Sequence, residues 1–199
     1  EEGIGSISYI TWRHEYIFTC NQLAWFSPGR VAGLAVLERE HPRARAYREI
    51  ARRELLESLE ATILGDGGYV EGPTYFRCVG RDAGLSLFLD ARASLGDFRG
   101  AIPPSMLRTA AFAAAIESTD ETADAIPICD GRPLMEQEAL AVMAHALPES
   151  RWAAMFEKSV RRGGGMPETV LAWQLGRTAR AARPAPAPCL VVLPEMGVA

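Results

Sequence analysis

The chain has 199 residues, of which 48% are hydrophobic, 23% charged and 8% aromatic. This composition is typical of a globular domain and unlike that of disordered chains. The formal net charge of −4 argues against a nucleic-acid-binding domain, which needs a basic surface. No apolar run approaches the ~18 residues of a membrane-spanning helix, so we expect no membrane span.

The cysteines and the N-terminus give little sign of a metal site or of a targeting signal. Cys20, Cys78, Cys129 and Cys189 form neither a CxxC motif nor a Cys/His cluster, so we expect no metal and no cofactor. Buried free thiols are the expectation, and one disulfide is the alternative. No basic stretch followed by an apolar run marks a signal peptide. Because the chain starts at Glu1, we expect it to begin and end inside a longer protein.

Apolar spacing predicts a mostly helical chain. A first helix is expected over 15–40, interrupted near Ser27-Pro28-Gly29. The clearest helix spans 43–64, where Tyr47, Ala51, Leu55, Leu59 and Ile63 recur every four residues and Ile50 widens the stripe. Gly65 is the expected left-handed cap of this helix.

Further helices are predicted over 74–89, 105–117, 136–147, 149–160 and 167–176, with loops at 97–104 and 118–135. An extended Ala/Pro linker follows at 181–188, and Cys189–Leu193 is the one strong strand signal. The expected fold class is therefore all-α, built from antiparallel helix pairs. We divide the chain into a helical domain over 1–180, the linker, and a β segment over 189–199.

Two polar segments stand out as candidate sites. Asn21 and Gln22 interrupt an apolar stretch, and such amides are also common as structural groups bonded to neighbouring helices. The second segment is Asp66-Gly67-Gly68-Tyr69-Val70-Glu71-Gly72-Pro73-Thr74-Tyr75-Phe76, whose glycines permit tight turns. It lacks the GxxxxGK[ST] pattern of a phosphate loop, and an ordinary helix connection with a packed tyrosine is the alternative interpretation.

These segments together resemble the heparinase II/III-like polysaccharide lyases. The resemblance rests on Cys20-Asn21-Gln22-Leu23, Val31-Ala32-Gly33-Leu34-Ala35, and Asp66-Gly67-Gly68-Tyr69 followed by Glu71-Gly72-Pro73-Thr74-Tyr75. The spacing from Asn21 to Tyr75 matches the layout of the family. Leu193-Pro194-Glu195-Met196-Gly197-Val198 also looks like the family's passage from its helical domain into a β-sandwich.

The resemblance implies an incomplete (α/α) toroid followed by an antiparallel β-sandwich. The implied activity is β-elimination on a uronic-acid polysaccharide, in which the proton next to the carboxylate is removed and the glycosidic oxygen is expelled. Tyr75 matches the tyrosine that acts as base and then acid. Asn21 matches the residue that neutralises the carboxylate and so makes the proton acidic.

The remaining site residues follow from their proximity to these two segments. We expect substrate contacts from Gln22, Trp25, Glu71, Arg77 and His14. Core packing for Trp25 and a surface position for Arg77 are the plain alternatives. Several family members have a histidine where this chain has Gln22, and a β-sandwich histidine completes their site. His145 is predicted to pack inside its helix.

Two other functions stay open from the sequence. An inverting glycoside hydrolase on an (α/α) barrel would need two carboxylates, for which Asp66, Glu71 and Asp130 are available. A non-catalytic glycan-binding domain is the third. The expected partners are an acidic polysaccharide and a β-sandwich domain of the same protein. That substrate class suggests the periplasm or the outside of the cell. We expect the chain alone to be a poor catalyst.

Overall fold

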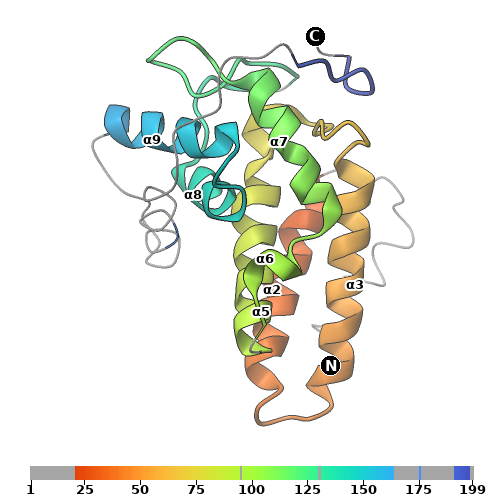
Figure 1. The fold of residues 1–199 in the computed structure, drawn as a ribbon. Helices are drawn as coiled ribbons and strands as arrows, with labels where there is room; N and C mark the ends of the chain where they lie inside the picture. Colours follow the sequence, from red (N-terminus) through yellow and green to blue (C-terminus); the bar gives the residue numbers. More distant parts are fainter. Residues whose placement is uncertain (1–20, 95, 130, 164–174, 176–190, 198–199) are drawn as a thin grey trace.

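The computed structural model describes residues 21–94, 96–129, 131–163, 175 and 191–197, and for residues 21–27 the helix backbone alone (Figure 1). Helices dominate this part of the chain, and no strand is assigned in it. The predicted all-α class is therefore confirmed at this level. None of the helices described is long and apolar enough to cross a membrane.

A long antiparallel hairpin of α2 (Asn21–Leu37) and α3 (Ala44–Thr62) forms one side of the molecule (Figure 1). The prediction of an interruption near Pro28 is wrong, because α2 continues through this residue. The predicted stripe of α3 is confirmed at Ala51, Leu55 and Leu59, which are fully buried. It is wrong at Tyr47 and Ile50, whose exposed fractions are 42% and 45%.

The predicted helix over 74–89 consists of three pieces. These are α4 (Gly72–Tyr75), the π-helix η2 (Cys78–Ala83) and α5 (Gly84–Ala93). A Cβ atom on Gly80 would lie 2.9 Å from the Ala139 Cβ, and one on Gly84 would lie 2.5 Å from a Val142 methyl carbon. The two glycines therefore let α8 approach η2 closely.

The other described helices pack around the hairpin of α2 and α3 and around the segment of α4, η2 and α5. They are α6 (Phe98–Ala101), α7 (Pro104–Ile116), α8 (Gln137–Ala146) and α9 (Arg151–Gly163). The predicted loop at 97–104 thus contains a short helix, capped by the Asp97 side chain. The core joins all of these elements and includes Phe112 and Trp152, both fully buried.

Near the C-terminus, residues 191–197 lie against the body of the helices. Leu193 is fully buried, and residues 194–197 form a turn in which the Gly197 N–H donates to the Pro194 carbonyl over 3.3 Å. No strand is assigned to 191–197, where the sequence predicted the end of one. Outside the described residues lie His14, Cys20, Cys189, Asp130, the predicted helix over 167–176 except for Leu175, and the linker at 181–188.

Candidate functional site

The candidate site starts with a tight turn after α3. Ile63 pairs with Tyr69 in an antiparallel bridge, and the Leu64 N–H donates to the Gly68 carbonyl over 2.8 Å. The positive φ of 90° that this turn requires falls on Gly67. The prediction of a left-handed cap at Gly65 is therefore wrong, and α3 ends at an extended Ile63 instead.

The next residues, 71–75, are held against residues 128–129 and 131–132, which belong to a second part of the chain. Gly72 has a φ of 78°, and a Cβ there would lie 2.6 Å from the Ile128 carbonyl oxygen. The Arg132 N–H donates to the Thr74 hydroxyl over 2.6 Å. A Cβ on Gly131 would lie 2.9 Å from the Pro73 ring. These contacts fix the backbone that carries Tyr75.

Two aromatic residues anchor this loop in the core. Tyr69 and Phe76 are fully buried, with ring centroids 5.6 Å apart in an edge-to-face contact. Phe76 also stacks on Trp152 at 4.7 Å. The Tyr69 hydroxyl donates to the Glu71 carboxylate over 3.3 Å, so this predicted substrate contact has an internal partner.

Tyr75 itself is half-buried and packs against the core. Its hydroxyl makes no hydrogen bond among the residues that the structure describes. A tyrosine hydroxyl that is not occupied by another side chain can exchange a proton with a bound molecule.

Asn21 begins α2, and one contact relates the position of this helix to Tyr75. The Ser86 hydroxyl of α5 donates to the Pro28 carbonyl of α2 over 2.5 Å, and α2 and α5 run in the same direction (Figure 1). Asn21 precedes Pro28 in α2, and Tyr75 precedes Ser86 in the segment of α4, η2 and α5, so both backbones lie on the N-terminal side of this contact. Gln22 and Trp25 follow in α2.

Arg77, a predicted substrate contact, is held in an ion pair. Its Nη1 lies 3.0 Å from Glu136, which also binds Arg81 over 2.6 Å. The hydrogen bond to Glu136 raises the pKa of Arg77. One carboxylate thus joins the segment after Tyr75 to the start of α8.

Asp66 binds backbone N–H groups. Its carboxylate accepts hydrogen bonds from Gly68 over 2.9 Å, from Glu195 over 2.7 Å and from Met196 over 3.2 Å. A carboxylate with three N–H partners has a structural task in the turn. Asp66 is therefore a poor candidate for one of the two catalytic carboxylates that an inverting glycoside hydrolase needs.

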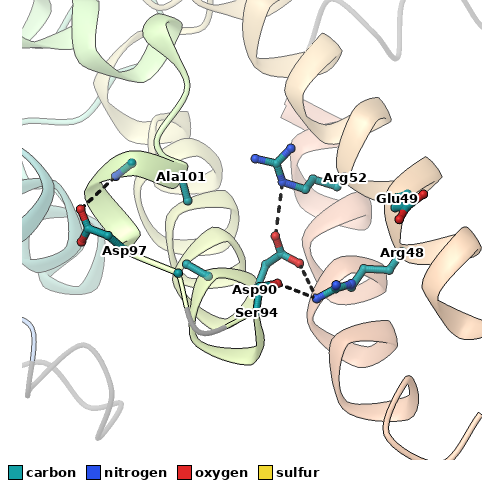
Figure 2. Close-up of a pocket in the computed structure, with 10 residues that line it drawn as sticks. Arg48, Glu49, Arg52, Asp90, Ser94, Asp97 and Ala101 are labelled. Atoms are coloured by element: carbon teal, nitrogen blue, oxygen red, sulfur yellow. Dashed lines mark hydrogen bonds and ion pairs between the residues drawn. The ribbon is translucent and has the colours of Figure 1, made fainter. Parts of the chain in front are cut away.

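The sequence analysis missed a charged pocket between α3 and α5. The pocket has a volume of about 470 Å³. Figure 2 shows Arg48 and Arg52 of α3 turned toward Asp90 of α5, which they contact at 3.2 and 3.3 Å. Ser94 accepts a further hydrogen bond from Arg48 over 3.1 Å. Asp90 is the one acidic residue in the mostly apolar stretch over 85–91, and this was the sequence signal that could have indicated the pocket.

Acidic side chains outnumber arginines around this pocket. Glu38 binds Arg48 on the side away from Asp90, at 2.9 Å, and Glu49 and Asp97 also line the pocket. The two arginines are therefore matched by acidic groups, and the network stabilises the contact between α3 and α5.

The two thiols in the described part differ in burial. Burial, with a contribution from Asp82, raises the pKa of Cys78 to about 11, which leaves it protonated at neutral pH. Cys129 is exposed and free. No group of three or more potential metal ligands is found among the residues described.

Comparison with family models, curated proteins and solved structures finds no match to this chain.

Proposed function

We propose that the chain is the helical part of a uronate-specific polysaccharide lyase of the heparinase II/III-like type. In this proposal the helices belong to an (α/α) toroid. Tyr75 removes the proton next to the substrate carboxylate and then protonates the leaving oxygen. Asn21 binds the carboxylate. The substrate is an acidic polysaccharide, for which Gln22, Trp25, Glu71, Arg77 and His14 are the candidate contacts.

The state of Tyr75 is the observation that supports this proposal most. Its ring packs on the core while its hydroxyl has no hydrogen-bond partner within the described chain. A general base must be accessible and also held in a fixed position. The contacts of Gly72 with Ile128 and of Thr74 with Arg132 supply that fixed position.

The position of Asn21 is compatible with its role. The carbon acid of a uronate becomes reactive when hydrogen bonds spread the negative charge of its carboxylate. The first turn of α2, where Asn21 lies, is at the same end of the helices as Tyr75. A substrate unit held there would place its carboxylate toward α2 and its acidic proton toward Tyr75.

The lyase is favoured over a hydrolase by the use of the acidic groups. Asp66 binds three backbone N–H groups and Glu71 accepts from Tyr69. Neither is left as an unoccupied carboxylate of the kind that an inverting mechanism needs as acid or base.

The proposal includes a β-sandwich domain that would close the cleft and supply a histidine. The chain alone would then bind acidic oligosaccharides weakly, with an affinity that falls as salt rises. We place the protein in the periplasm or outside the cell, where such polymers occur.

The experiment is an assay of the chain, alone and joined to its natural neighbours, on a panel of uronate polymers. We expect an unsaturated uronide, detected by its ultraviolet absorbance, from the longer protein. Cleavage that yields saturated reducing ends would establish a hydrolase. Binding without any turnover in the longer protein would establish a glycan-binding domain.

A further inference from the structure

A short C-terminal segment lies directly on the turn that precedes the candidate site. We call Leu193–Gly197 the tail segment and Gly65–Gly68 the glycine turn. The tail segment reaches the turn from about 130 positions away in the sequence. Leu193 is fully buried, so it fixes one end of the segment in the core.

Two acidic side chains join the segments reciprocally. Asp66 accepts from the backbone N–H groups of Glu195 over 2.7 Å and of Met196 over 3.2 Å. Glu195 in turn accepts from the Gly65 N–H over 2.7 Å. Because both carboxylates bind backbone groups, each one recognises the conformation of the opposite segment.

The glycines of the turn are those that this contact requires. A Cβ on Gly65 would lie 2.8 Å from the Glu195 carboxylate, and one on Gly68 would lie 2.8 Å from the Met196 Cβ. Gly67 lies even closer to another element, because its Cβ would be 2.1 Å from the Arg108 carbonyl oxygen of α7. The turn is therefore covered on one side by the tail segment and on another by α7.

We propose that the glycine turn is a docking site for a peptide turn, occupied by the tail segment, and that this docking orders the loop carrying Tyr75. Asp66 and Glu195 are the two groups that hold the tail segment. The inference concerns order in the chain and does not rest on the proposed lyase activity.

A chain of backbone hydrogen bonds links the docking site to that loop. The Gly68 carbonyl accepts from Leu64, the Val70 N–H donates to Thr62 over 3.2 Å, and the Gly72 N–H donates to Tyr69 over 3.0 Å. When the tail segment leaves, Met196 no longer packs on Gly68, and these backbone hydrogen bonds open more often. The opening spreads toward Gly72, three residues before Tyr75.

The test is amide hydrogen exchange, resolved by residue, in the full chain. Asp66→Ala removes the acceptor for Glu195 and Met196 and also that for Gly68 within the turn. Glu195→Ala removes only the acceptor for Gly65 and leaves the bond between Asp66 and Gly68 in place, so it is the variant that tests docking alone. A lost hydrogen bond to a charged group speeds exchange roughly tenfold or more. We expect that increase at the freed amides in each variant, and a smaller increase at Val70 and Gly72 in both.

Asp97→Ala is the matched control. Asp97 also accepts from two backbone N–H groups, those of Arg99 and Gly100, but at the start of α6. It should speed exchange at those two amides alone. Unchanged exchange at Val70 and Gly72 in the Asp66 and Glu195 variants would overturn the proposal, as would an equal increase there in the control.

Glu195 keeps the test decisive if Asp66→Ala does not fold. Glu195 is exposed, so its replacement removes no core contact. Glu195→Gln retains an oxygen that can accept from Gly65 and should restore most of the protection that Glu195→Ala loses. Equal exchange in the two Glu195 variants would contradict a role for this hydrogen bond.

Discussion

Replacement by alanine should have opposite effects on stability at two glycines of this chain. Gly72 has a positive φ and no room for a Cβ beside Ile128. Gly33 lies inside α2, and a Cβ there would meet nothing within 4 Å. We expect Gly72→Ala to lower the free energy of unfolding by about 2 kcal/mol or more. Gly33→Ala should raise it by up to about 1 kcal/mol. Urea unfolding of both variants measures the difference, and equal effects would contradict the backbone geometry described.

His145 links stability to pH. Its ring stacks on Phe98 with the centroids 5.8 Å apart. Burial lowers the pKa of His145 below the usual histidine value of 6.5, repulsion from Arg99 adds to this, and Asp97 opposes it. The unfolded chain therefore takes up this proton first as the pH falls, so the stabilising contribution is complete above about 6.5 and declines below it.

The matched variant for this prediction is His145→Gln, which cannot titrate. We expect the wild-type chain to lose more unfolding free energy than the variant between about pH 7.5 and pH 5.5. Denaturant unfolding at the two pH values measures this difference. Parallel losses in the two proteins would show that His145 is not the group responsible.

At the scale of helices, the network around Asp90 joins α3 to α5. Asp90 is largely buried and contacts Arg48 and Arg52 (Figure 2). We expect Asp90→Asn to lower the free energy of unfolding by on the order of 2 kcal/mol, because two arginines lose a charged partner in a partly buried place.

Arg45→Ala is the control for the Asp90 variant. Arg45 lies on α3, the helix that carries Arg48 and Arg52, but its side chain is 69% exposed and it pairs with an exposed Glu49. Such surface pairs contribute about 0–1 kcal/mol. Thermal unfolding of both variants compares them, and a loss in Asp90→Asn no larger than that in Arg45→Ala would contradict the structural role of Asp90.

The helices could be predicted where local periodicity determines burial. Leu55 and Leu59 lie in the middle of a regular stripe, and both are fully buried. Tyr47 continues the stripe in sequence but is 42% exposed, because burial also requires an opposing element at that height. The break of the helix over 74–89 into η2 and α5 depends on the approach of α8 to Gly80. The sequence pattern over 74–89 gives no indication that α8 packs there.

The location of the candidate site could be predicted from the sequence, but the structural role of a residue such as Asp66 could not. The glycines and the aromatic pair Tyr69 and Phe76 mark a fixed loop in the sequence. The bonds from Asp66 to Glu195 and Met196 depend on a contact between distant segments. Sequence spacing cannot indicate such a contact, so the structural use of Asp66 emerged only with the fold.

At the scale of the whole molecule, the described helices form a single core that reaches from α2 to α9 and includes Leu193. The tail segment, the loop at 63–75, and residues 128–129 and 131–132 meet at one end of this core. The proposed cleft lies at that end, with Tyr75 fixed by contacts from two other parts of the chain. The proposed function therefore depends above all on the Tyr75 hydroxyl group.

The most direct measurement is turnover of a uronate polymer by Tyr75→Phe, followed by the ultraviolet absorbance of the unsaturated product. It uses the longest natural protein that carries this chain. Tyr47→Phe, a substitution of an exposed tyrosine on α3, is the matched control. We predict a loss of about 10²–10⁴-fold in kcat for Tyr75→Phe with unchanged thermal stability, because the ring keeps its packing and only the proton carrier is removed. Near-normal turnover of Tyr75→Phe, or an equal loss in Tyr47→Phe, would contradict the proposed role of Tyr75.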